Sequence, residues 1–232
     1  MSVMFGGLLF DGANSAMIST RDLSGLPEVG RLRRLMRSQA MLDAILCPEW
    51  ESRHFSFDSK WARGQQMGSM RNAQGDHYFT LFNVSGCWLK GFDHGAPMSP
   101  FSANPPMVSP GVLDGAPAEF ADCLSEPAFV IAETTFCIWR RYSDSNWQHG
   151  AVAFPPGIND PDGSAHLLRW LDGLPNTYRQ WAQDYYECEV SAEAVESIFG
   201  HRPLNQDIVT ELNRDLELSQ LHEDVEQIGY PE

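Results

Sequence analysis

Residues 75–95 read GDHYFTLFNVSGCWLKGFDHG, and this stretch decides the fold. The run 77–82 is rich in aromatic and strand-favouring residues, and a second such run follows at 87–92. Between them, Asn83-Val84-Ser85-Gly86 has the composition of a tight turn. The stretch therefore predicts a hairpin of two antiparallel strands.

Segments on both sides extend this hairpin into a sheet. The aromatic residues of 54–61 lie in phase, and 65–72 can pair back against that run after a break at Gly64. The turns are too short for the crossover helices of a parallel sheet, so the sheet is expected to be an antiparallel meander. Further along, 134–142 (TTFCIWRRY) is β-branched and aromatic and predicts another strand, and 151–154 predicts a further short one.

Helical patterns flank the predicted strands. Apolar residues recur at helical spacing over 27–46, with proline at the start of the pattern and again just beyond it. The proline-rich connection 95–117 is expected to be irregular, and a short helix is expected between it and Pro127. The C-terminal region predicts helices near 167–171, at 175–187 and 192–199, and in two acidic stretches, 204–216 and 218–228.

These patterns predict an α+β fold, in which an antiparallel sheet is flanked by an N-terminal helix and several C-terminal helices. The chain of 232 residues is 43% hydrophobic and 20% charged, which suffices for a substantial core. We expect one domain over 26–232. Residues 1–25, rich in Gly, Ser and Ala, are expected to form a loosely ordered lead-in.

The charge balance is strongly acidic. The chain has 31 Asp and Glu against 16 Lys and Arg, a formal net charge of −15. Residues 1–75 are slightly basic, and nearly all the excess acid lies beyond them, most densely after Asp184. Such a field repels phosphate backbones and anionic membranes, so neither nucleic acid nor a membrane is expected as a partner. A concentration of carboxylates attracts basic partners instead. The alternative is a solvated helix face that keeps the protein soluble.

Cysteine usage and the apolar runs indicate a cytoplasmic protein. The number of cysteines, five, is odd and no pair forms a CxxC motif, which argues against a disulfide framework or a zinc ribbon. The apolar run 3–10 is interrupted by glycines and has no basic residue before it, so it is a poor signal peptide. No stretch reaches the roughly 20 apolar residues of a membrane helix.

The hairpin carries the first candidate site. Residues whose numbers sum to about 169 face each other across the predicted turn, which sets Asp76 opposite Asp93. His77 and His94 follow directly, so two acids and two imidazoles could form a metal site or an acid–base pair at one sheet end. The alternative is that these residues flank turns and are solvated. Because neighbours on a strand point to opposite faces, the four cannot all converge, and we expect no metal site.

The second candidate is a binding surface. Tryptophan, tyrosine and arginine dominate binding hot spots, and here two arginines stand almost alone among carboxylates, so one could bind an anionic ligand or a partner. The alternative is an internal ion pair combined with aromatic stacking. The residues concerned are Trp139, Arg140, Arg141, Tyr142 and Trp147.

Other motifs carry less. Cys137 could act as a thiol nucleophile, but a mid-strand cysteine is more often a small buried hydrophobe. The oxygen-rich stretch 159–163 (NDPDG) has the wrong spacing for a calcium loop and predicts a turn leading into a helix. The chain has no nucleotide-binding, zinc-protease or serine-hydrolase motif, and we expect no cofactor.

Three functions remain open, with a binding protein favoured over an enzyme. The first is an acidic cytoplasmic protein that docks a basic protein partner, as an inhibitor or immunity-type protein does. The second is an enzyme or small-ligand binder with a site at the sheet end under the loop 95–117, near Asp76, His94 and Arg140. The third is a structural subunit of a homo-oligomer.

Overall fold

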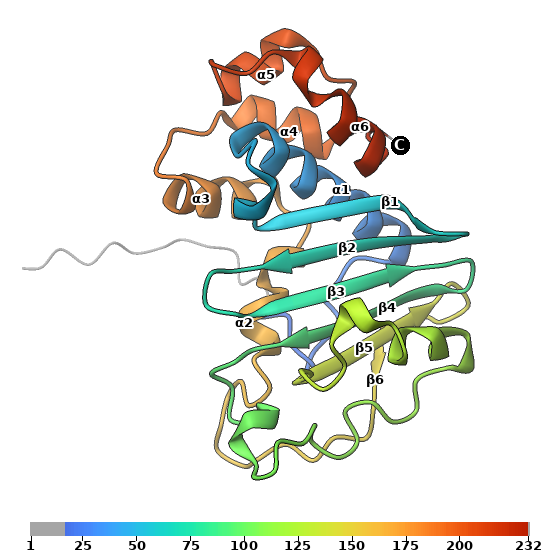
Figure 1. Ribbon diagram of the computed structural model, residues 1–232. Helices are drawn as coiled ribbons and strands as arrows, with labels where there is room; N and C mark the ends of the chain where they lie inside the picture. The colour runs from blue at the N-terminus through green and yellow to red at the C-terminus, as the bar shows by residue number, and fades with distance from the viewer. Residues whose placement is uncertain (1–16, 232) are drawn as a thin grey trace, which may run out of the picture.

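Six antiparallel strands form one sheet in a computed structural model that describes residues 17–231 (Figure 1). The strands lie in chain order, as expected for a meander, and the α+β prediction is confirmed. Their bounds are Phe55–Ala62 (β1), Gln65–Arg71 (β2), His77–Phe82 (β3), Gly86–Phe92 (β4), Phe136–Arg141 (β5) and Gln148–His149 (β6).

The β3–β4 hairpin has the predicted register. His77 pairs with Phe92 and Phe82 pairs with Cys87. The Asn83 side chain closes the turn, because its Oδ1 accepts hydrogen bonds from the backbone N–H groups of residues 85 and 86. Gly86 is required by close packing, since a Cβ at this position would lie 2.2 Å from the carbonyl oxygen of Arg140 on β5.

The predicted strand at 151–154 is wrong. The last strand is β6, which pairs with β5 through Ile138 opposite His149 and Trp139 opposite Gln148. The chain then leaves the sheet: a Cβ on Gly111 would lie 2.3 Å from the carbonyl oxygen of Ala151. Residues after 150 therefore pack against the long connection rather than against a strand.

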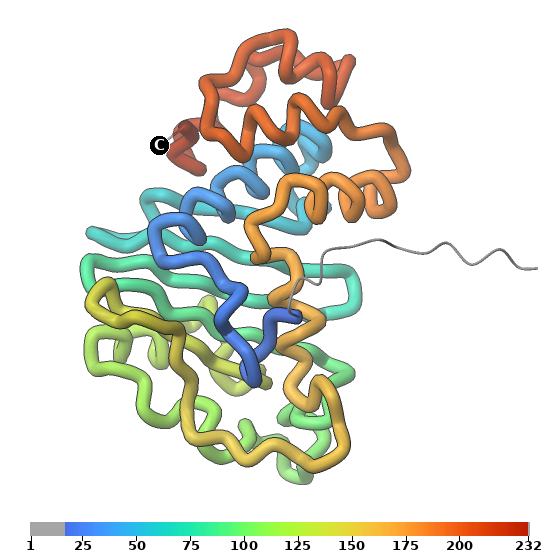
Figure 2. The backbone as a smooth tube through the Cα atoms, turned by 180° about the vertical axis from the view of Figure 1, so that it is seen from behind, coloured from blue at the N-terminus to red at the C-terminus, as the bar shows by residue number. Residues whose placement is uncertain are grey.

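Helix α1 (Val29–Leu46) lies on one face of the sheet, over β1 and β2 (Figure 2). It begins where the Glu28 carboxylate accepts hydrogen bonds from the N–H groups of Gly30 and Arg31, which have no partner inside the helix. Its apolar side packs mainly on β1 and β2, in a core that also includes inward-facing residues of β3 and β4. Core members from the helix and the sheet include Leu32, Met36, Met41, Leu42, Phe55, Phe57, Met70 and Tyr78.

The other face of the sheet is covered by irregular chain from the connection that follows β4. Phe129 stacks on Trp88 of β4, with ring centroids 5.8 Å apart, and on Phe79 of β3. The short helix expected before Pro127 is a 3₁₀ helix, Ala118–Leu124. It contributes Phe120 and Cys123 to this second core. The proline-rich connection is thus mainly a cover for a sheet face.

The C-terminal helices gather beyond the β1 edge (Figure 1). We call residues 175–231 the helical lobe. The Ser191 and Asn205 side chains cap two of its helices, and α6 lies beside β1, where Ser59 Oγ donates to the Gln227 carbonyl oxygen at 2.7 Å. The helices are α2 (Ser164–Leu168), before the lobe, and α3 (Pro175–Tyr185), α4 (Ala192–Phe199), α5 (Gln206–Leu212) and α6 (His222–Ile228) within it.

The expected lead-in, 1–25, falls partly outside the described residues, which begin at 17. Residues 17–28, here called the N-terminal strap, pack on the start of α2 and on the residues just before it. Thr20 is buried, its N–H donates to Ser164 Oγ, and its hydroxyl donates to Asp162 Oδ2. Along the described part of the chain, no helix has the length and apolar character needed to cross a bilayer.

Candidate functional site

A cleft of about 420 Å³ opens at the sheet end where β3 begins and β4 ends. It brings together three of the four predicted hairpin residues, Asp76, Asp93 and His94. Two further residues, Asp160 and His166, join them from the segment around the start of α2. We call this the sheet-end cleft.

Asp76 holds the cleft together. It is buried, and its Oδ1 accepts from the His94 N–H at 2.8 Å while its Oδ2 accepts from the Asn72 side-chain amide at 2.8 Å. The Asn72 oxygen in turn accepts from the Asp76 N–H. One carboxylate therefore joins the β2–β3 turn to the residues that follow β4.

The pKa of the Asp93 carboxyl group in this cleft is raised. Burial is the main cause, and the neighbouring Asp76 carboxylate adds to it. Its Oδ1 accepts from the Gly95 N–H, which acts in the opposite direction. Gly163 packs directly on this side chain, since a Cβ there would lie 2.3 Å from the Asp93 Cβ. Desolvation beside a like charge is a setting that suits a proton-transfer group.

The predicted turn at 159–163 is confirmed, and it supplies the rest of the cleft. Gly163 has a φ of +71°, and α2 begins at the next residue. The Asp160 carboxylate accepts from the N–H groups of Ala165 and His166. His166 Nδ1 accepts from Arg169 at 3.0 Å, which leaves the ring proton on Nε2.

The cleft can therefore offer acid–base chemistry, with Asp93 and two imidazoles close together. In residues 17–231, no group of three or more histidine, cysteine or carboxylate side chains has the arrangement of a metal site. Asp160 and His166 were not anticipated, because only the packing of α2 against the end of β4 brings them here. The polar stretch 159–163 was the available signal, and it was interpreted as a turn alone.

His77 does not join the cleft but pairs with Lys90. Lys90 is 0% exposed, and its Nζ donates to His77 Nε2 at 2.8 Å, to the Glu133 carbonyl oxygen at 2.6 Å and to the Val130 carbonyl oxygen at 3.4 Å. Burial lowers the pKa of Lys90 to about 7 and that of His77 to about 4. This lysine, alone within an apolar strand, was not singled out from the sequence, although its isolation was a usable signal.

The residues of the second candidate, the predicted binding surface, lie in different parts of the structure. Arg140 and Trp147 line a pocket beside β6, whereas Trp139 is buried in the second core and Tyr142 is 53% exposed. Arg141 pairs with Asp144 at 3.2 Å, as the ion-pair alternative expected. These residues do not form one surface.

Arg140 also lies far from the sheet-end cleft, which corrects its expected place near Asp76 and His94. It pairs with Cys87 at the start of β4, whereas Asp93 follows the end of that strand. At about 3.4 Å per residue, the two positions are roughly 20 Å apart along the strand.

Cys137 lies in a setting that opposes nucleophilic chemistry. It is buried between the sheet and its irregular cover, and burial raises the pKa of its thiol far above the usual range. Cys123, nearby in the same core, has its pKa raised to about 12 by burial. Thiolate formation, which reactivity requires, is therefore disfavoured at both residues.

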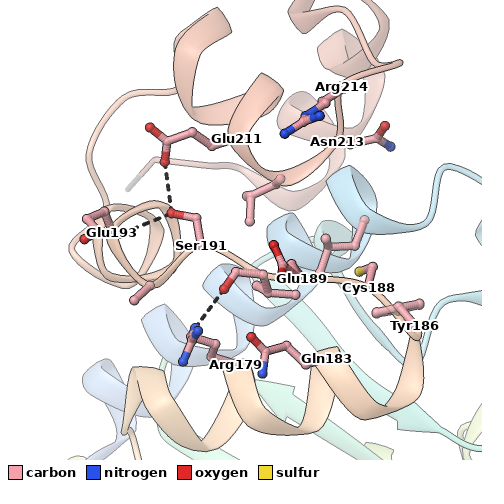
Figure 3. A pocket seen from close by; sticks show the side chains of 14 residues that line it. Arg179, Gln183, Tyr186, Cys188, Glu189, Ser191, Glu193, Glu211, Asn213 and Arg214 are labelled. Carbon is pink, nitrogen blue, oxygen red and sulfur yellow. Dashed lines mark hydrogen bonds between the residues drawn. The ribbon is translucent and has the colours of Figure 1, made fainter.

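A second hollow, with a volume of about 970 Å³, lies in the helical lobe (Figure 3). We call it the lobe groove. Three exposed glutamates border it from three segments: Glu189 precedes α4, Glu193 lies in its first turn, and Glu211 belongs to α5. Ser191 Oγ lies between two of them, 3.0 Å from Glu211 Oε2 and 3.4 Å from Glu193 Oε2.

Two arginines also line the lobe groove. Arg179 is turned to the backbone, because its Nε donates to the Val190 carbonyl oxygen at 2.7 Å. Arg214 is exposed. Apolar side chains such as Val190 and Leu212 complete the lining. The groove thus combines carboxylates at its border with an apolar surface.

Comparisons of the chain with protein-family models, curated proteins and solved structures found no match.

Proposed function

We propose that this protein binds a more basic protein partner through its helical lobe, as a cytoplasmic inhibitor or immunity-type protein. The observation that carries the proposal is the lobe groove, where three glutamates border a partly apolar hollow that two arginines also line. A lysine or arginine side chain of a partner has a matching character, with an apolar stem and a charged head.

The charge around the groove supports the same partner. Between residues 175 and 231 there are twelve carboxylates and three arginines, and eleven of the twelve acids are exposed. Two of them serve the fold, because Asp224 pairs with Arg53 and Glu226 with Lys60. A surface with this excess of one sign speeds the approach of an oppositely charged protein and disfavours acidic competitors.

The cysteines support a reducing location. All five are free thiols, and three of them, Cys87, Cys123 and Cys137, are buried. Proteins exported to oxidising compartments more often pair their cysteines.

The test is a pull-down from a lysate of the cells that make the protein, at low salt, with three baits. They are the wild type, a groove variant (Glu189→Gln, Glu193→Gln, Glu211→Gln) and a control variant (Asp114→Asn, Glu119→Gln, Asp122→Asn). The control residues are exposed and lie on the irregular cover of the sheet, so both variants lose three charges. The expected result is a basic protein held by the wild type and the control but not by the groove variant.

The dependence of binding on ionic strength is the second measurement. Retention of that protein should fall as salt is added, because exposed charge pairs are screened. A partner that binds all three baits equally, or none at any salt, would count against the proposal.

A second candidate function is favoured by the sheet-end cleft, where Asp76, Asp93 and His94 converge with Asp160 and His166. In this reading the protein is an enzyme or small-ligand binder, and Asp93 is the proton-transfer group. Native mass spectrometry of the purified protein should then show a retained small molecule. The Asp93→Asn variant should lose it, whereas the groove variant should keep it.

A further inference from the structure

A third hollow, of about 380 Å³, lies beside β6 and gathers basic side chains. The N-terminal strap forms one side of it, and the end of β5 with residues 145–149 forms the other. We call it the strap pocket. Arg21, Arg140 and His149 line it, against one carboxylate, Asp22, among the described lining residues.

In the part of the chain that the structure describes, Arg140 makes no ion pair within 4 Å, although its charge and that of Arg141 both help to lower the pKa of the nearby Asp144 carboxyl. Its Nε donates to the main-chain oxygen of Asp144 at 3.2 Å. The carboxylate of Asp144 is taken by the next residue, Arg141, which donates to it from both its backbone N–H and its Nε. Among residues 17–231, nothing accepts from the two Nη groups of Arg140 within hydrogen-bond distance.

The hydrogen bonds of the other charged or polar groups that line the pocket also go to main-chain atoms. The Arg21 guanidinium lies over the Phe154 ring, 5.3 Å from its centroid, and donates to the Asn159 carbonyl oxygen at 3.3 Å. His149 Nδ1 donates to the Gly150 carbonyl oxygen at 2.7 Å, which leaves Nε2 without a proton on the neutral ring. The Asp22 carboxylate accepts from the Ser24 N–H.

From this geometry we propose that the strap pocket binds a small molecule through an oxyanion, a phosphate or carboxylate group, held by the guanidinium groups of Arg140 and Arg21. Guanidinium forks match such groups and bind them through charge-assisted hydrogen bonds. Ser24, Ser145 and Asn146 add short polar side chains to the lining. In a chain with a net charge of −15, two arginines whose side-chain hydrogen bonds go to main-chain oxygens concentrate positive potential at this place.

The strap pocket is separate from the lobe groove and the sheet-end cleft, and its ligand is not the basic partner proposed above. Trp147 forms a fixed wall: it is buried, and its Nε1 donates to the Pro27 carbonyl oxygen at 2.8 Å. That bond joins the strap to the chain just before β6. A ligand bound in the pocket should therefore affect both the strap and the chain just before β6.

Isothermal titration calorimetry with inorganic phosphate, and separately with acetate, tests the proposal on the full chain at constant ionic strength. The wild type should bind at least one of the two anions saturably, at one site per chain. Arg140→Met and Arg21→Met should each weaken binding by roughly tenfold or more, since each removes a hydrogen bond to a charged group. The anion bound more tightly identifies the ligand class.

Arg63→Met is the matched control, because it removes the same charge far from the pocket. Arg63 is exposed near the β1–β2 turn. The control variant should leave the affinity unchanged. Arg21 is also exposed, so its variant keeps the test valid if Arg140→Met fails to fold. No saturable binding of either anion, or equal binding by the wild type and both pocket variants, would overturn the proposal. Neither outcome would bear on the lobe groove.

Discussion

Lys90 Nζ donates to His77 Nε2 over 2.8 Å, between neighbouring strands and out of contact with solvent. The His77 ring also donates from Nδ1 to the Gly75 carbonyl oxygen, which fixes its neutral tautomer. Lys90 reaches in addition to the Val130 and Glu133 carbonyl oxygens. A single ammonium group thus joins the β2–β3 turn to the cover of the second sheet face.

Lys90→Met should destabilise the protein by about 1–3 kcal/mol, because it leaves buried acceptors unpaired. Urea denaturation near neutral pH measures this loss. Lys60→Met is the control, since Lys60 is exposed and its ion pair with Glu226 is solvated. It should change the unfolding free energy much less.

The cost of Lys90→Met should also depend on pH. The pKa of Lys90 is about 7 in the folded protein and 10.5 in its ordinary state, so the unfolded chain binds more protons between these values. The unfolding free energy of the wild type should therefore rise with pH across that interval, and the variant should lack this rise. A difference between the two proteins that stays constant from pH 7 to pH 10.5 would contradict the assignment.

His54 should weaken the fold in acid. It is buried among aromatic rings, and burial lowers its pKa from 6.5 to about 4. The unfolded chain binds this proton in that interval and the folded protein does not, so the wild type should lose stability as the pH falls from 6.5 to 4. His54→Phe should lose less over the same range. Urea denaturation at several pH values measures the stability of both proteins. An equal loss of stability in the two would refute this prediction.

Asp43 is the buried junction between α1, β1 and α3. Its Oδ2 accepts from the N–H groups of His54 and Phe55, and its Oδ1 accepts from the Tyr178 hydroxyl at 2.6 Å. Burial nevertheless raises its pKa to about 6. Tyr178→Phe should cost about 1–3 kcal/mol and raise the pKa of Asp43 further, because it removes a hydrogen bond to the charged form. Tyr185→Phe, at a partly exposed position, should have little effect on denaturation.

Substitutions at two glycines distinguish the cost of backbone strain from the cost of crowding in the sheet-end cleft. Gly163 and Gly157 have φ values of +71° and +75°, but a Cβ on Gly163 would strike Asp93, whereas one on Gly157 would meet nothing within 4 Å. Gly157→Ala should cost about 1–2 kcal/mol, the strain of a left-handed residue with a side chain. Gly163→Ala should cost clearly more in thermal unfolding. Equal shifts for the two variants would mean that the cleft yields freely around Asp93.

Local patterns predicted the elements well. The 192–199 helix has the predicted bounds because Ser191 caps it and Gly200 follows it, and the hairpin register follows from the Asn83 turn. The strand at 151–154 could not be judged in this way. Its departure from the sheet depends on the close approach of Gly111, which is remote in sequence.

The sites were less predictable for the same reason. The pairing of Asp76 with Asp93 follows from one turn, so those two residues and His94 could be placed together. Asp160 and His166 reach the cleft only through tertiary packing. Tertiary packing also divides the predicted tryptophan and arginine residues between a core and a pocket. Lys90 depends on carbonyl groups about 40 residues away, which no local pattern can supply.

The outermost strands of the sheet limit how copies of this chain could associate. At one margin, β6 pairs through two residues only, and at the other, α6 lies beside β1, with Ser59 bonded to Gln227. A short edge strand and a covering helix are two of the ways in which proteins limit pairing at a sheet edge. Both margins therefore carry features that disfavour strand addition by another copy of the chain, the step from which fibrous growth can follow.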